Sequence, residues 1–290
     1  MTSHACLALA LLALAPRALA TPQNVLWLPL GDSITHGCTG PTIQDCHATC
    51  AGYRIPLALA LSQPPLGAPT LEGFNVTTMG TATTGPSYVP AQWLRHCGFP
   101  GWTIPMINSF LPKALASSPA RPDLVTIHLG TNDCGQGHPL AQMTADMNTL
   151  LNSTFQASPA SHVFLADTIA TGMPFNTCIV CVPCPRATGR GAGAPPPRTQ
   201  VGPHARASSP PRPPTRSAWN AAVPGLVAAW AARGMKITFV PMYAEVRLCG
   251  DAGEDADLCG GHQVHPTSAG YPRMASAFAL QIMKYFERTQ

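Results

Sequence analysis

Charged residues are scarce in this chain of 290 residues. Asp, Glu, Lys and Arg together make up 10% of it, whereas hydrophobic residues make up 46%. Such a chain can bury one sizeable core, and its length leaves little room for two full domains. Beyond the first twenty residues no apolar run is long enough to span a membrane, and no internal repeat is visible. The sequence therefore predicts one globular domain without a transmembrane segment.

Basic charge is confined to a single segment. The formal net charge is +4, but six arginines lie between Cys181 and Arg216, where Lys, Asp and Glu are absent. Without these six arginines, 11 basic residues face 13 acidic ones and the balance becomes −2. A basic groove for nucleic acid is therefore not expected.

The N-terminus has the pattern of a secretion signal. The apolar run Leu7–Ala15 is too short to cross a bilayer, and the small-residue pattern Ala18-Leu19-Ala20 follows it. We therefore expect residues 1–20 to be a signal peptide and the mature protein to be secreted and extracellular. Asn75-Val76-Thr77 and Asn152-Ser153-Thr154 are sequons for glycosylation, which would require such export.

Cysteine usage agrees with export. Of the eleven cysteines, Cys6 lies in the leader and ten remain, an even number that suits disulfide bonds in an oxidising compartment. The three cysteines of the run Cys178–Cys184 have metal-binding spacing, but in an exported chain disulfides are the expected use. Cys249 and Cys259 are candidates for a disulfide, although sequence alone does not fix the pairing.

Short apolar runs and amphipathic segments alternate along residues 21–290. The predicted strands are Asn24–Leu30, Phe74–Met79, Leu124–Leu129, His162–Asp167 and Lys236–Pro241. The predicted helices are Tyr53–Leu61, Ile104–Leu115, Leu140–Leu151, Ala218–Ala232 and Ala269–Phe286. This alternation indicates a parallel sheet covered by helices on both faces. Active sites of such sheets lie at the carboxyl ends of the strands.

A Pro/Arg-rich tract, Cys181–Arg216, interrupts the crossover between the strand ending near Asp167 and the helix beginning near Ala218. Its 36 residues include ten prolines, and Val182 and Val201 are its only large aliphatic residues. A segment of this composition cannot bury a core, so we expect disorder. Two origins remain open: a tolerated surface loop, or a retained intron translated in frame.

Polar side chains follow glycines at the ends of two predicted strands. The first strand leads into Gly31–Gly37, GDSITHG, whose glycine allows a sharp turn that places the Ser33 hydroxyl at the carboxyl edge. The third leads into Gly130–Asp133, GTND, and an amide such as Asn132 can donate to an oxyanion without titrating. A helix cap and a turn are the ordinary alternatives for these two motifs.

A histidine precedes the last predicted helix. In Val264-His265-Pro266-Thr267 the proline restricts the backbone, so the imidazole is presented rigidly at the helix entrance. Imidazole is the side chain whose ordinary pKa suits proton transfer near neutral pH. Taken alone, His265 could equally be a surface or capping residue.

Together and in order, GDSITHG, GTND and HPTSAGYPRMA resemble the first, third and fifth sequence blocks of the SGNH hydrolases, also called GDSL esterases. Gly98–Ile104, GFPGWTI, resembles the second block as it occurs in secreted carbohydrate esterases of the acetylxylan-esterase type. The resemblance covers nearly all of residues 21–290 outside 181–216. It implies one domain, a three-layer α/β/α sandwich on a five-stranded parallel sheet. It also implies an esterase for short acyl groups, such as acetyl, on polysaccharide or on small esters.

The resemblance also implies roles for individual residues. Ser33 would be the nucleophile and His265 the general base. The backbone N–H of Gly101 and the side-chain amide of Asn132, together with the Ser33 N–H, would form the oxyanion hole. No metal and no organic cofactor are implied, and no oligomeric state is indicated.

The chain departs from the family pattern at two positions. The fifth block normally has an aspartate three residues before the histidine, which orients it, and His262 stands there. Either Asp257 supplies the missing carboxylate, or the enzyme works as a Ser–His dyad. In the carbohydrate esterases a glutamate usually precedes the glycine of the second block, and here that residue is Cys97.

Two other functions remain open. One is an exported carbohydrate-binding protein of weak or no activity on the same scaffold, for which the residue His262 argues. The other is a lipid-directed GDSL lipase, against which the lack of a broad apolar lid segment argues. A metal site is not expected, because His262 and His265 have no evident third ligand in the sequence.

The composition of the Pro/Arg-rich tract generates a first prediction. Deleting Cys181 to Arg216 should preserve or improve secretion and esterase activity, because the tract lacks core-forming residues. Immunoblotting of the medium and an ester-hydrolysis assay measure this, and sequencing the transcript separates the two origins. Loss of soluble protein on deletion would show that the tract is structural.

Overall fold

The computed structural model describes residues 22–40, 45–63, 73–169, 216–246 and 264–289. Several features predicted above lie outside these ranges. They are the expected signal peptide 1–20, the Cys178–Cys184 run, residues 181–215 of the Pro/Arg-rich tract, Cys249, Asp257, Cys259 and His262.

A mostly parallel sheet forms the centre of the fold. Its strands are β1 (Asn24–Gly31), β2 (Asn75–Thr78), β3 (Ala82–Thr83), β4 (Arg95–Gly98), β5 (Leu124–His128), β6 (His162–Ala166) and β7 (Ile237–Val240). The order is β3-β4-β1-β5-β6-β7, and β2 pairs with the first half of β1, ahead of β4. Only the short β3–β4 pair is antiparallel among the described strands.

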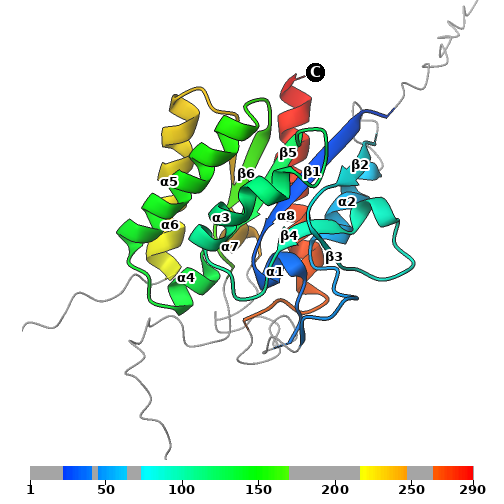
Figure 1. Cartoon of the computed structure of the whole chain (residues 1–290), viewed down its shortest axis with the longest axis horizontal. Helices are drawn as coiled ribbons and strands as arrows, with labels where there is room; N and C mark the ends of the chain where they lie inside the picture. Colours follow the sequence, from blue (N-terminus) through cyan, green and yellow to red (C-terminus); the bar gives the residue numbers. More distant parts are fainter. Residues whose placement is uncertain (1–21, 41–44, 64–72, 170–215, 247–263, 290) are drawn as a thin grey trace, which may run out of the picture.

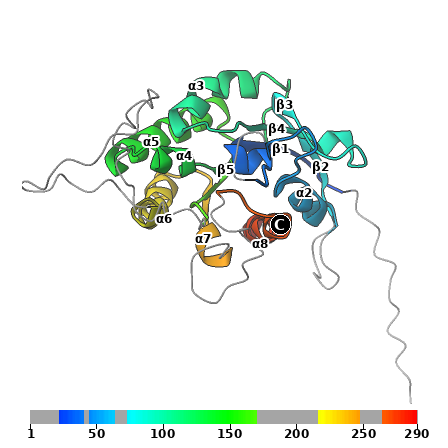
Figure 2. The same ribbon diagram turned by 90° about the horizontal axis from the view of Figure 1, so that it is seen from below.

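Helices cover both faces of the sheet (Figure 1 and Figure 2). On one face lie α2 (Arg54–Ser62), α8 (Gly270–Thr289) and the short α7 (Met242–Glu245). On the other lie α3 (Ile104–Leu115), α5 (Leu140–Ala157) and α6 (Arg216–Ala232). Two short helices, α1 (Ser33–His36) and α4 (Thr131–Gly135), follow directly after β1 and β5, and a 3-10 turn, η2 (Ala91–Trp93), precedes β4.

This architecture confirms the predicted fold class. Each of the five predicted strands and five predicted helices is present, with ends shifted by a few residues. The sheet is larger than the expected five parallel strands, because β3 and β4 were missed. β3 has two residues, and β4 reads Arg-His-Cys-Gly, which has no alternating apolar pattern. The last helix before β7 begins at Arg216, within the tract expected to be disordered.

The side chains of alternate residues in the central strands pack into two separate hydrophobic cores, one on each face of the sheet. Val25 and Trp27 of β1 pack toward α2 and α8, whereas Leu28 and Leu30 pack toward α3 and α5. Because both faces of the sheet are covered by helices, the central strands are continuous apolar runs in the sequence. The polar end of the Trp27 side chain is also satisfied, because its Nε1–H donates to Thr126 Oγ1 of β5 at 2.9 Å.

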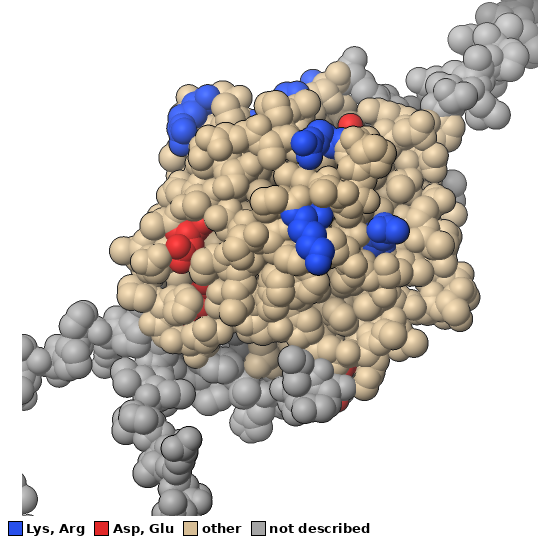
Figure 3. Space-filling model, in the orientation of Figure 1, with Lys and Arg blue, Asp and Glu red and all other residues tan. Residues whose placement is uncertain are grey.

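Surface charge and helix length bear on nucleic-acid binding and on membrane insertion. On the face in Figure 3 the basic residues stand apart on uncharged surface, and they form no continuous basic patch. Within the described ranges, none of the helices combines the length and the apolar character needed to cross a bilayer.

A buried arginine ties together the loops at the carboxyl end of β1. Arg54, the first residue of α2, is fully buried, and burial lowers the pKa of its guanidinium to about 10, so it is charged at neutral pH. It donates to five backbone carbonyls and one hydroxyl. These acceptors are Thr35 O, His36 O, Cys50 O, Thr84 O, Leu94 O and Thr84 Oγ1, at 2.8 to 3.3 Å. The segment after β1 is thus held to the segments around β3 and η2.

Replacing this side chain tests its structural role. Arg54→Met should lower the free energy of unfolding by about 3 kcal/mol, because several buried carbonyls lose their donor. Arg95→Met is the matched control, since Arg95 is exposed and donates to Gly80 O at 3.2 Å, and it should cost about 0.5 kcal/mol or less. Urea unfolding of both variants measures the difference. Equal losses would contradict the role assigned to Arg54.

Candidate active site

The carboxyl ends of three neighbouring strands bring the predicted site residues to one edge of the sheet. Gly31 of β1 is in register with Gly98 of β4 and with His128 of β5. Ser33 follows the first of these strands, Gly101 the second and Asn132 the third. Figure 1 shows α1, α4 and α7 together at this end of the molecule.

Close packing at the end of β1 explains its glycine. A Cβ on Gly31 would lie 2.0 Å from Thr35 Oγ1 and 2.8 Å from His128 O, so no larger residue fits. The next residue, Asp32, accepts from the Ile34 N–H at 2.9 Å and caps α1. The same turn therefore caps α1 through Asp32 and places Ser33 at the carboxyl end of β1. Ser33 is the first residue of α1, and its side chain is buried, with 5% exposed.

His265 lies against Ser33, although 232 positions separate them in the sequence. His265 Nε2 is 2.7 Å from Ser33 Oγ, and His265 Nδ1 bonds to the backbone carbonyl of Gly40. A carbonyl can only accept, so Nδ1 carries the proton. In the neutral ring Nε2 then has the free lone pair and accepts from the Ser33 hydroxyl. This is the tautomer that a base acting on Ser33 needs.

The other two predicted residues lie on adjoining loops. Asn132 is half-buried in α4, and its Nδ2 donates to Trp102 O at 2.8 Å, which joins it to the loop that contains Gly101. An amide NH₂ has two donors, so this bond leaves one. Gly101 is exposed at a φ of +80°, and an added Cβ would meet nothing within 4 Å. The glycine is explained by its backbone conformation, which other residues rarely adopt.

A residue that the sequence analysis did not single out fixes these two loops. Asp133 is fully buried, and its two carboxylate oxygens lie 3.2 and 3.3 Å from the Ile104 N–H at the start of α3. His138 Nδ1 lies 3.4 Å from the same carboxylate. Burial raises the pKa of Asp133, and the Ile104 N–H opposes this rise. The GTND motif marked the position, but nothing in the sequence identified Ile104 as the partner.

The electrostatic surroundings of His265 favour its neutral form. Burial lowers the pKa of His265 below its ordinary value of 6.5, and the Gly40 hydrogen bond and the charge of Asp45 oppose this shift. The thiol of Cys97, which stands where the carbohydrate esterases usually have glutamate, is buried in β4, and burial raises its pKa. It is therefore not a substitute for that carboxylate.

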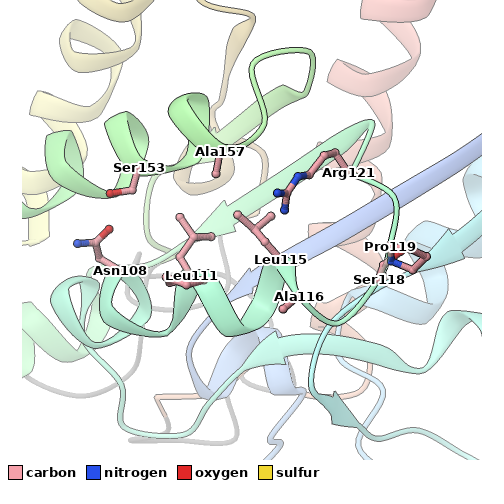
Figure 4. Close-up of a pocket in the computed structure, with 10 residues that line it drawn as sticks. Asn108, Leu111, Leu115, Ala116, Ser118, Pro119, Arg121, Ser153 and Ala157 are labelled. Carbon is pink, nitrogen blue, oxygen red and sulfur yellow. The ribbon is translucent and has the colours of Figure 1, made fainter.

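Within the described segments, no group of three His, Cys, Asp or Glu side chains is arranged to hold a metal ion. A cavity of about 450 Å³ lies between α3, α5 and the loop before β5, as Figure 4 shows. Its lining includes Ala116, Ser118 and Arg121, which precede β5 and so lie at the amino edge of the sheet, opposite Ser33. It is therefore separate from the candidate site.

A mostly parallel sheet covered by helices on both faces thus brings a serine and a histidine into contact at its carboxyl edge. Residues 30–273 match the model of the GDSL-like lipase/acylhydrolase family. The chain belongs to this family, and it is an ester-hydrolysing enzyme. A comparison with curated proteins gave no match.

Solved structures share the fold. A family 3 carbohydrate esterase from Clostridium thermocellum is 21% identical, with a TM-score of 0.61, over 91% of this chain and 99% of that one. A family 3 carbohydrate esterase from Talaromyces cellulolyticus is 18% identical, with a TM-score of 0.57, over 91% and 99%. The acetylxylan esterase Axe2 from Geobacillus stearothermophilus, solved as a catalytic mutant, is 15% identical, with a TM-score of 0.54, over 90% and 95%.

The lowered pKa of His265 predicts the pH dependence of activity. A general base works when it is neutral, so kcat/KM should rise with pH through the pKa of His265 and then level off. Because burial lowers this pKa, the inflection should lie below 6.5. Initial rates on p-nitrophenyl acetate from pH 4 to 8 measure it. An inflection above 6.5 would contradict the environment described for His265.

Proposed function

We propose that the protein is a secreted serine esterase that removes short acyl groups, such as acetyl, from an acylated polysaccharide or a small ester. The observation that carries the proposal is the 2.7 Å contact between Ser33 Oγ and His265 Nε2. The bond from His265 Nδ1 to Gly40 O leaves Nε2 as the acceptor, so the pair is ready for proton transfer.

The proposed reaction has two halves. Ser33 Oγ attacks the ester carbonyl carbon while His265 Nε2 takes its proton, and the imidazolium then protonates the leaving alcohol. Water next attacks the acyl carbon while His265 takes its proton, and the bond from that carbon to Ser33 Oγ then breaks as the imidazolium returns the proton to Oγ, which releases the carboxylic acid and restores Ser33. In both halves the oxyanion would accept from the N–H groups of Ser33 and Gly101 and from the second N–H of Asn132.

The Ser33 amide suits this use. As the first residue of α1 its N–H has no acceptor within the helix, so it can be directed at an oxyanion. The Asp133 carboxylate holds the Gly101 and Asn132 loops together from beneath. Its proposed role is to keep the two outer donors at a fixed separation.

The substrate we favour is an acylated polysaccharide or a small ester with a short acyl group. Two of the structures that share the fold are named family 3 carbohydrate esterases and a third is an acetylxylan esterase. The large apolar side chains that are most exposed in the described ranges come from separate parts of the fold rather than from one continuous apolar surface. They are Leu59, Tyr88, Met106, Tyr243 and Leu280. We therefore favour a short acyl group over the lipid-directed alternative.

The carbohydrate-binding alternative has one argument in its favour, the unusual His262. Against it stands the arrangement of Ser33, Gly101, Asn132 and His265 at one strand edge. A protein that only binds carbohydrate has no need of a serine hydroxyl in contact with an imidazole. We therefore propose that the site is catalytic.

Two substitutions test the proposal together. Ser33→Ala should lower turnover by about 10³-fold or more, and Asn132→Ala by about 10²- to 10³-fold with a smaller change in KM. Ser109→Ala and Gln156→Ala, on the exposed sides of α3 and α5, are matched controls and should keep full activity. The substrates are p-nitrophenyl esters from acetate to long chains and acetylated xylan.

Three outcomes would count against the proposal. Appreciable turnover by Ser33→Ala would remove Ser33 as nucleophile. An effect of Asn132→Ala confined to KM would mean that Asn132 only positions the substrate. A preference for long-chain esters would favour the lipase alternative.

A further inference from the structure

The partner of His265 Nδ1 is a backbone carbonyl where a catalytic triad has a carboxylate. Gly40 O accepts the Nδ1–H bond, and this fixes the orientation and the tautomer of the ring. A carbonyl carries no net charge, however, so it stabilises the imidazolium less than a carboxylate does. The structure therefore raises the question of which group supplies negative charge near His265.

The segment that presents Gly40 is held from several sides. A disulfide joins Cys38 to Cys46 across eight positions, with their Cα atoms 4.4 Å apart. The Tyr271 hydroxyl, on the same helix that follows His265, donates to Cys38 O at 2.5 Å. Gly40 O and His265 are thus fixed relative to one another by the disulfide and by α8.

A carboxylate lies directly against Gly40. A Cβ built on Gly40 would lie 2.0 Å from Cγ and 2.3 Å from Oδ2 of Asp45, the residue before the disulfide partner Cys46. The charge of Asp45 favours protonation of His265. Within the described ranges, His36 at the end of α1 also interacts electrostatically with His265, and burial lowers the pKa of His36, which favours its neutral form.

We propose that Gly40 and Asp45 together take the place of the triad acid. The carbonyl of Gly40 orients His265, and the carboxylate of Asp45, packed against Gly40, supplies negative charge that stabilises the imidazolium. During attack the Ser33 proton moves to Nε2, while the Nδ1 proton stays on the ring and bonded to Gly40 O. Gly40 and Asp45 are positioning residues, and the proposal rests on the proposed function.

Removing the charge of Asp45 at constant size tests its part. Asp45→Asn should lower kcat on p-nitrophenyl acetate about tenfold, far less than the 10⁴-fold loss of an acid in direct contact, with KM nearly unchanged. The inflection of kcat/KM should also move to lower pH, because a negative charge near His265 is lost. Asp146→Asn, on α5 and away from the site, is the control and should change neither quantity.

Gly40→Ala tests the role of the Gly40 carbonyl as the hydrogen-bond acceptor of His265. The new Cβ would clash with Asp45, so the loop must move and the Nδ1 partner with it, and kcat should fall more than tenfold. Gly40→Ala/Asp45→Gly removes the clash as well as the charge. Its kcat should therefore recover to the level of Asp45→Asn, which a general loss of folding would not allow.

The competing explanations give different results. If Asp257→Asn lowers kcat by about 10³-fold or more while Asp45→Asn is silent, Asp257 is the acid and the inference is overturned, whereas the proposed function stands. A large rise in kcat on His262→Asp, with Asp45→Asn silent, overturns it in favour of an unassisted dyad. Full activity of Gly40→Ala overturns the role of the carbonyl. Failure of the proposed function shows separately, as turnover by Ser33→Ala.

Discussion

The contact between Ser33 and His265 is the interaction on which the rest of the site depends. It joins the segment after β1 to the segment before α8, which are 232 positions apart, so it forms only when these two distant parts of the chain are folded together. Both side chains are almost fully buried, and a buried hydroxyl and imidazole must find partners. Each satisfies the other, and Gly40 satisfies the remaining ring nitrogen.

The surroundings of this contact explain residues that have no chemistry of their own. Position 31 takes only glycine, because Thr35 and His128 leave no room for a Cβ. Arg54 is buried where it donates to backbone carbonyls of α1. Asp133 reaches from α4 to the start of α3. Together these contacts hold three segments at the strand ends in place, which is a condition for fixed positions of the proposed oxyanion donors.

Much of the fold and of the candidate site could be predicted from the sequence, because the motifs and apolar runs that mark them are local in the sequence. Apolar runs such as Leu124–Leu129 and the glycines of GDSITHG and GTND mark the strands and their ends directly. The short strand β4 was missed, because Arg95–Gly98 has no such pattern. The Gly40 carbonyl and Asp45 were missed for another reason. A backbone acceptor has no residue signature, and its pairing with His265 spans 225 positions.

The most direct test of the account is covalent labelling of the purified protein with a fluorophosphonate, followed by intact-mass and peptide mass spectrometry. Such a reagent reacts with a serine that an adjacent base has activated. The account predicts one adduct per chain, on the peptide that contains Ser33, and its disappearance in His265→Ala. An adduct on a different serine, or unchanged labelling of Ser33 without His265, would contradict it.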